Sequence, residues 1–127
     1  MSMSQADRIT GFLQCLRDEH PKIRASMVAK KGLEGLIMFP QSFKEEVSNV
    51  WEPLSGSIDD ILTLVGRYSG FGQMRIYSEI LGFGVFYLPL PMSDTALVVF
   101  VTGEDPLKES FDILPAMEET RKKIIEL

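Results

Sequence analysis

The sequence predicts an α/β (α+β) protein in which a five-stranded antiparallel sheet carries helices on both faces. Two apolar runs, residues 85–90 and 95–101, flank a polar segment with Pro91 and Asp94, which is typical of a β-hairpin. Both runs are apolar at consecutive positions, so these strands must be covered on both faces. Elsewhere the hydrophobic pattern changes several times between helical and strand periods.

The first forty residues predict a helix that leads into a hairpin. The helix runs from Ser4, a suitable N-cap, to about Glu19. Its apolar residues recur at i, i+3, i+4 and i+7 and form one stripe: Ile9, Phe12, Leu13 and Leu16. From Ile23 the apolar residues alternate, which predicts a strand. A turn at residues 30–32 then leads to a second strand over residues 33–39.

The middle of the chain predicts two consecutive helices. Ser42 and Glu45 have the spacing of a capping box, and the first helix is expected to end near Pro53 within residues 41–56. The second helix is expected to begin with Ser57 as its cap and to end before a glycine-rich turn at residues 69–72.

The remaining elements are a third strand over residues 74–80, the hairpin, and a final helix that begins at Asp105 and Pro106. Pro115 is expected to kink or restart that helix. The order is therefore α-β-β-α-β-β-β-α, and residues 1–127 form one domain. The first and last helices can share one face of the sheet, and the middle helix can take the other.

Composition narrows the function classes. The chain has 127 residues, 45% of them hydrophobic and 24% charged, which is typical of a globular domain. Its net charge of −5 argues against binding to nucleic acid or to anionic membranes. No apolar run approaches the ~18 residues of a membrane span, and the single cysteine cannot form an internal disulfide. We therefore expect a cytoplasmic protein without membrane insertion.

No pattern predicts a catalytic, metal or cofactor site. The glycine pairs at residues 70–72 and 82–84 lack the further residues of a phosphate-binding loop. Cys15 and His20 are expected to point in different directions, and Cys15 is expected to be a buried apolar residue. The chain is therefore expected not to be an enzyme. Trp51 is interpreted either as a core residue or as an anchor for a partner.

Two segments resemble one known family. RASMVAKKGL at residues 24–33 looks like the first hairpin of the Roadblock / dynein light chain family. GFGVFYLPL at residues 82–90 and TALVVFV at residues 95–101, followed by the Asp-Pro helix start, look like its last hairpin. Together with the element order, the resemblance covers nearly the whole chain. It implies a Roadblock/profilin-like fold, a homodimer, and a small Ras-like GTPase as partner.

The limited area of the sheet that the middle helix can cover gives an independent argument for a homodimer. The expected middle helix, of ~12 residues, would cover only part of its face of the sheet, and its apolar arc is wide. The third strand is a plausible unprotected sheet edge, guarded only by Arg75 and Glu79. We predict that the following residues form the dimer and partner interface: Ile61, Leu64, Val65, Tyr68, Met74, Ile76, Tyr77 and Ile80. Alternatively, residues 42–52 fold over this surface and complete the core within one chain.

The preferred hypothesis is a non-enzymatic homodimeric scaffold that binds and regulates a Ras-like GTPase. The alternative is a PAS- or profilin-like sensory module, which would hold a small molecule in a cavity between sheet and helix. A small enzyme is disfavoured because no acid–base pair is evident.

Overall fold

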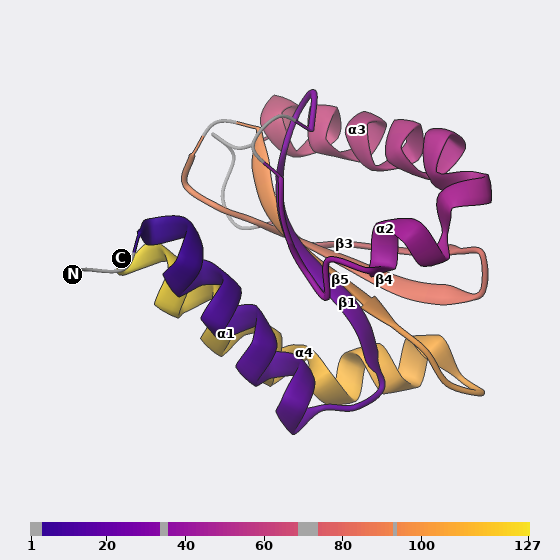
Figure 1. The fold of residues 1–127 in the computed structure, drawn as a ribbon. Helices are drawn as coiled ribbons and strands as arrows, with labels where there is room; N and C mark the ends of the chain where they lie inside the picture. The colour runs from indigo at the N-terminus through magenta and orange to yellow at the C-terminus, as the bar shows by residue number, and fades with distance from the viewer. Residues whose placement is uncertain (1–3, 34–35, 69–73, 93) are drawn as a thin grey trace.

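The computed structural model describes residues 4–33, 36–68, 74–92 and 94–127 (Figure 1). The element order agrees with the sequence prediction, apart from the middle segment. The elements are α1 (Gln5–Glu19), β1 (Ile23–Lys30), β2 (Ile37–Phe39), α2 (Phe43–Glu46), the short 3-10 helix η1 (Ser48–Val50), α3 (Trp51–Tyr68), β3 (Ile76–Ile80), β4 (Phe83–Pro89), β5 (Thr95–Val101) and α4 (Pro106–Ile125).

The five strands form one antiparallel sheet in the order β2-β1-β5-β4-β3. β5 is central and pairs with β1 through Met27 opposite Val98, and with β4 through Phe86 opposite Val99. Every residue of β5 is buried. The predicted sheet, with its hairpin at the centre, is therefore confirmed, and β2 and β3 are its two edges.

Helices cover both faces of the sheet, as predicted. α1 and α4 lie side by side on one face, and α3 with α2 lies on the other (Figure 1). Alternate residues of the central strands divide accordingly: Leu88 and Val99 pack toward α1 and α4, whereas Tyr87 and Phe100 pack toward α3. This two-sided burial is the physical reason for the continuous apolar runs in the sequence.

The two terminal helices begin as their capping residues predict. The Ser4 hydroxyl accepts a hydrogen bond from the Asp7 amide at 3.1 Å, and the Asp105 carboxylate accepts one from the Lys108 amide at 3.2 Å. Pro115 lies inside α4, but the predicted restart does not occur, because α4 is one helix from Pro106 to Ile125. Ile113 and Met117 are buried on either side of the proline and keep both halves on the sheet.

The middle helices differ most from the prediction. α3 begins at Trp51, not after Ser57, and it passes through Pro53 and Gly56 without a break. Pro53 is the third helical residue, where the amide would have no partner within the helix, so proline is tolerated there. The Ser57 hydroxyl donates to the Pro53 carbonyl at 3.1 Å within the helix, and the Ser42 side chain makes no capping bond.

Two turns are fastened to α3. The Asp59 carboxylate accepts a hydrogen bond from the Gly32 amide in the turn after β1, at 2.6 Å. At Gly66 a Cβ atom would lie 1.6 Å from the Asp94 carboxylate, so a larger residue there would displace the Asp94 side chain of the turn before β5. The second strand is also shorter than predicted, since β2 begins at Ile37; residues 34–35 lie outside the described residues.

Candidate interaction surface

The first part of the candidate surface is the β3 edge of the sheet. Within the part of the chain that the structure describes, β3 pairs only with β4, with Ile76 opposite Tyr87 and Ile80 opposite Phe83. Its apolar residues are all half-buried, in contrast to the fully buried central strand. A sheet edge presents a row of backbone donors and acceptors that another strand can pair with. The prediction that this strand is an outer strand is confirmed.

The second part is the outer face of α3. At 18 residues α3 is about 27 Å long, longer than predicted. Its inner face is buried on the sheet: Leu54, Ile58, Leu62 and Val65. On the outer side Leu64 is 39% exposed and Tyr68 is 48% exposed, while Ile61 is half-buried. Val65, which was also predicted for the interface, is only 1% exposed, because it lies seven residues after Ile58 on the same helical face.

The predicted strand residues separate onto the two sides of the sheet. Ile76 and Ile80 pack on the α3 side, and half-buried Met74 lies just before the strand. Tyr77 points to the α4 side, where its ring centroid lies 5.2 Å from that of Phe86. Tyr77 therefore lies on the opposite side of the sheet from Ile76 and Ile80. The glycine-rich turn predicted at residues 69–72 lies outside the described residues.

The charged residues that guard β3 are also held on the α4 side. The Arg75 guanidinium pairs with the Glu118 carboxylate of α4 at 2.6 Å. The Tyr77 hydroxyl donates to the Glu79 carboxylate at 3.2 Å. Burial, together with this neighbouring carboxylate, raises the pKa of the Tyr77 hydroxyl above 10.0. The α3 side of the strand is consequently apolar, apart from Ser78.

Residues 42–52 cover part of the sheet that was expected to lie bare. Phe43 is fully buried, and its ring centroid lies 5.0 Å from that of Phe100 and 5.8 Å from that of Phe83. Val47 is buried as well. The alternative prediction for this segment is thus correct for the interior strands. The apolar residues that are only partly buried on this side include Ile76 and Ile80 of β3 and Ile61 of α3, and also residues beside β2 such as Leu36 and Trp51.

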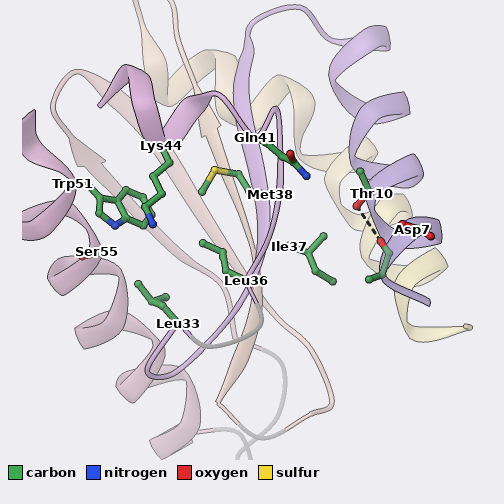
Figure 2. A pocket seen from close by; sticks show the side chains of 11 residues that line it. Asp7, Thr10, Leu33, Leu36, Ile37, Met38, Gln41, Lys44, Trp51 and Ser55 are labelled. Atoms are coloured by element: carbon green, nitrogen blue, oxygen red, sulfur yellow. Dashed lines mark hydrogen bonds between the residues drawn. The ribbon is translucent and has the colours of Figure 1, made fainter. Parts of the chain in front are cut away.

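A groove of about 550 Å³ lies at the opposite edge of the sheet, beside β2 (Figure 2). Trp51 borders it and also packs against the core, and the Lys44 ammonium lies 5.3 Å from the centroid of its ring. The lining residues come from α1, from β2 and its preceding loop, and from the segment that leads into α3: Ala6, Asp7, Thr10, Leu33, Leu36, Ile37, Met38, Gln41, Lys44, Trp51 and Ser55.

Sequence reasoning missed this groove because it placed Trp51 near the end of a helix instead of at the start of α3. The sequence did contain a signal, because Lys44 lies seven residues before the single tryptophan, Trp51. The sequence alone does not indicate which strand these two residues lie against. The groove follows the sheet edge and differs from the cavity between sheet and helix that a small-ligand module would have.

Metal-binding clusters and membrane-spanning helices are absent from the described ranges. In these ranges no group of three or more histidine, cysteine, aspartate or glutamate residues is placed to hold a metal ion. No helix among the described residues has the length and apolar character needed to span a membrane. Cys15 is exposed, contrary to its expected burial.

Comparison with known proteins identifies the fold. No family model and no curated protein matches the sequence. Among solved structures, MglB of Myxococcus xanthus superposes with a TM-score of 0.65 at 12% identity, covering 99% of this chain and 91% of that chain. A chain from the complex of LokiProfilin1 with rabbit actin superposes with a TM-score of 0.55 at 16% identity, covering 99% and 98%. The chain has a Roadblock-like fold. At these identities the likeness shows the fold alone.

Proposed function

We propose that the chain is a non-enzymatic, cytoplasmic scaffold that forms a homodimer and binds a small Ras-like GTPase. The observations that carry the proposal are the exposed Leu64 and Tyr68 of α3 and the outer edge of β3. Ile76 and Ile80 of that edge lie on the same side of the sheet as α3, and both charged neighbours of the edge are held on the other side. The Roadblock-like fold supports it, because the family resemblance implies the same mode of association.

In the proposed dimer, β3 of each protomer pairs antiparallel with β3 of the other about a two-fold axis. Such pairing extends the sheet through both protomers and gives the edge backbone hydrogen-bond partners. It also brings the two α3 helices together, so that Leu64, Tyr68 and Ile61 become buried. Burial of exposed apolar area on both helices stabilises the dimer by roughly 25 cal/mol per Å².

The two α3 helices would together form the surface that receives the GTPase. The GTPase itself follows from the resemblance to the Roadblock family, and no arginine of this chain is assigned a catalytic role. The chain would act by binding, either to position the GTPase or to favour one of its nucleotide states.

The test is a binding titration with Ras-like GTPases from the same source, each loaded with GDP or with a non-hydrolysable GTP analogue. We expect at least one to bind with a nucleotide preference of about tenfold or more, and Leu64→Glu to abolish that binding. Leu107→Glu is the matched control, because Leu107 is 45% exposed on α4, away from α3. Absence of binding by every GTPase, or equal binding by the Leu64→Glu protein, would contradict the proposal.

The small-ligand alternative makes a different prediction for the purified protein. Native mass spectrometry would then find a 14.3 kDa chain carrying an added small-molecule mass. The scaffold proposal predicts an unliganded dimer in the same experiment.

A further inference from the structure

We propose that the groove beside β2 binds an extended peptide segment of a partner protein, which adds a strand to the free edge of β2 and places an acidic side chain against Lys44. This inference is independent of the proposed dimer, because the groove lies at the opposite edge of the sheet.

The lining of the groove shows that it follows the edge of the strand. Consecutive residues of β2 point to opposite sides: Met38 packs with the α3-side core, and Ile37 packs with the α1-side core. Both nevertheless border the groove, together with Trp51 on one side and Thr10 on the other (Figure 2). A space bordered from both faces lies in front of the hydrogen-bonding edge of the strand.

This geometry favours an extended chain as the occupant. Among the described residues β2 has one neighbour in the sheet, β1, so its backbone groups on the other side have no strand partner within that part of the chain. An added strand would use these groups and would send alternate side chains to the two sides of the groove. A compact small molecule would fill one side and leave the strand edge unpaired.

Charge determines the chemistry of the segment. Lys44 takes part in none of the ion pairs found among the described residues, whereas its neighbour Glu46 is held by Arg24 at 2.5 Å. The Lys44 side of the groove thus favours a carboxylate, and its apolar floor at Leu33 and Leu36 favours an aliphatic side chain two positions along. Asp7, on the opposite side, favours a basic residue between them.

The chain provides its own reporter for the test. Trp51 is the only tryptophan, so its fluorescence reports binding in this groove. The probes are two blocked hexapeptides, TEKVTV and its reverse VTVKET, which present the same alternation in either strand direction. A third peptide, TEVKVT, has the same composition, but its glutamate and lysine point to the same side of a strand. We expect one alternating peptide to change the emission with a Kd below about 1 mM, and at least tenfold weaker binding by TEVKVT.

Backbone N-methylation tests strand addition directly. Methylation of the amides that face β2 should weaken the binding peptide at least tenfold, whereas methylation of the intervening amides should leave its Kd within about twofold. Equal effects of the two methylation patterns, or no emission change with either alternating peptide, would overturn the proposal.

A charge exchange tests the assignment of Lys44. Lys44→Glu should weaken the acidic peptide at least tenfold and strengthen the peptide in which lysine replaces glutamate, a gain that an unfolded variant could not show. Lys108→Glu on α4 is the control and should bind as the wild type does. Unchanged preference in the Lys44→Glu protein would overturn this assignment. Because Leu64→Glu does not touch the groove, that variant should bind the peptides normally even if the proposed dimer is wrong.

Discussion

β2 and β3 are the two edge strands of the sheet, and each has backbone groups that another strand could pair with. The side chains that surround the two edges are different. β3 has five residues, its Ile76 and Ile80 lie on the α3 side of the sheet, and its nearby charges are held on the opposite side by Glu118 and Tyr77. β2 has three residues and lies in a groove that places Trp51 and Lys44 on one side and Asp7 on the other. An apolar, self-complementary edge suits a second copy of the same chain, whereas a charged groove suits a different segment.

If the two edges differ in this way, residues 42–52 beside β2 must be packed firmly in the core of each protomer. Phe43 provides the test with the largest expected effect, since it is fully buried between Phe83 and Phe100. Phe43→Ala should lower the free energy of unfolding by about 3–5 kcal/mol, because it removes a buried ring and leaves a cavity. Urea denaturation measures this change.

The control for Phe43→Ala is Phe111→Ala, since Phe111 is 53% exposed. It should cost less than half as much. If the two variants were equally stable, residues 42–52 would contribute little to the core. The segment beside β2 would then not be a fixed part of the fold, and the proposed difference between the β2 and β3 edges would be contradicted.

A smaller effect is expected at the contact that fastens the β1–β2 turn to α3. Asp59→Ala leaves the Gly32 amide without its 2.6 Å partner and should cost about 1–2 kcal/mol. Hydrogen exchange at Gly32 should also become faster. The control is Asp60→Ala, an exposed neighbour. A stability loss equal to that of the control would show that this turn, and the groove with it, is not held by α3.

Patterns that depend on local periodicity were predictable from the sequence. The faces of β4 and β5 followed from the alternation of residues such as Val85 and Phe86, and the caps of α1 and α4 followed from Ser4 and Asp105. These features depend on neighbours within a few residues, so one sequence contains the information needed to assign them.

Features that depend on tertiary packing were not predictable. Pro53 and Gly56 favour a helix end, but the burial of Leu54 and Ile58 on the sheet holds them in α3. Val65 looked equivalent to Leu64 in an apolar arc, although one faces the core and the other faces outward. The groove was missed because its walls come from segments whose proximity arises only in the fold.

Removal of Arg75, one of the charged residues beside β3, is expected to have only a small effect on stability and on dimer affinity. The Arg75–Glu118 pair is exposed, with side chains 50% and 32% accessible, so Arg75→Ala should cost less than about 1 kcal/mol. Because the pair lies on the α4 side, the dimer dissociation constant should stay within about threefold. Lys22→Ala, which removes a similar pair with Glu109, is the control. A change of tenfold or more in dimer affinity for Arg75→Ala alone would place the charge within the interface.

The last effect is confined to alkaline solution and concerns Tyr87, opposite Ile76 in the register. Burial raises the pKa of the Tyr87 hydroxyl above 10.0. The unfolded chain therefore loses this proton first, and the free energy of unfolding should fall as the pH rises above about 10. Tyr87→Phe should reduce that fall between about pH 8 and about pH 10.5, as measured by urea denaturation. An identical fall in both proteins would mean that water reaches this side of the sheet beside β3.

The most direct test of the β3 and α3 interface is the molar mass in solution. Light scattering during size exclusion should give twice 14.3 kDa for the wild type across a range of concentrations. The Leu64→Glu protein should elute at 14.3 kDa with an unchanged circular dichroism spectrum, and Leu107→Glu should elute as the wild type does. A wild-type mass of 14.3 kDa at every concentration, or a Leu64→Glu protein that still dimerises with wild-type affinity, would contradict the account.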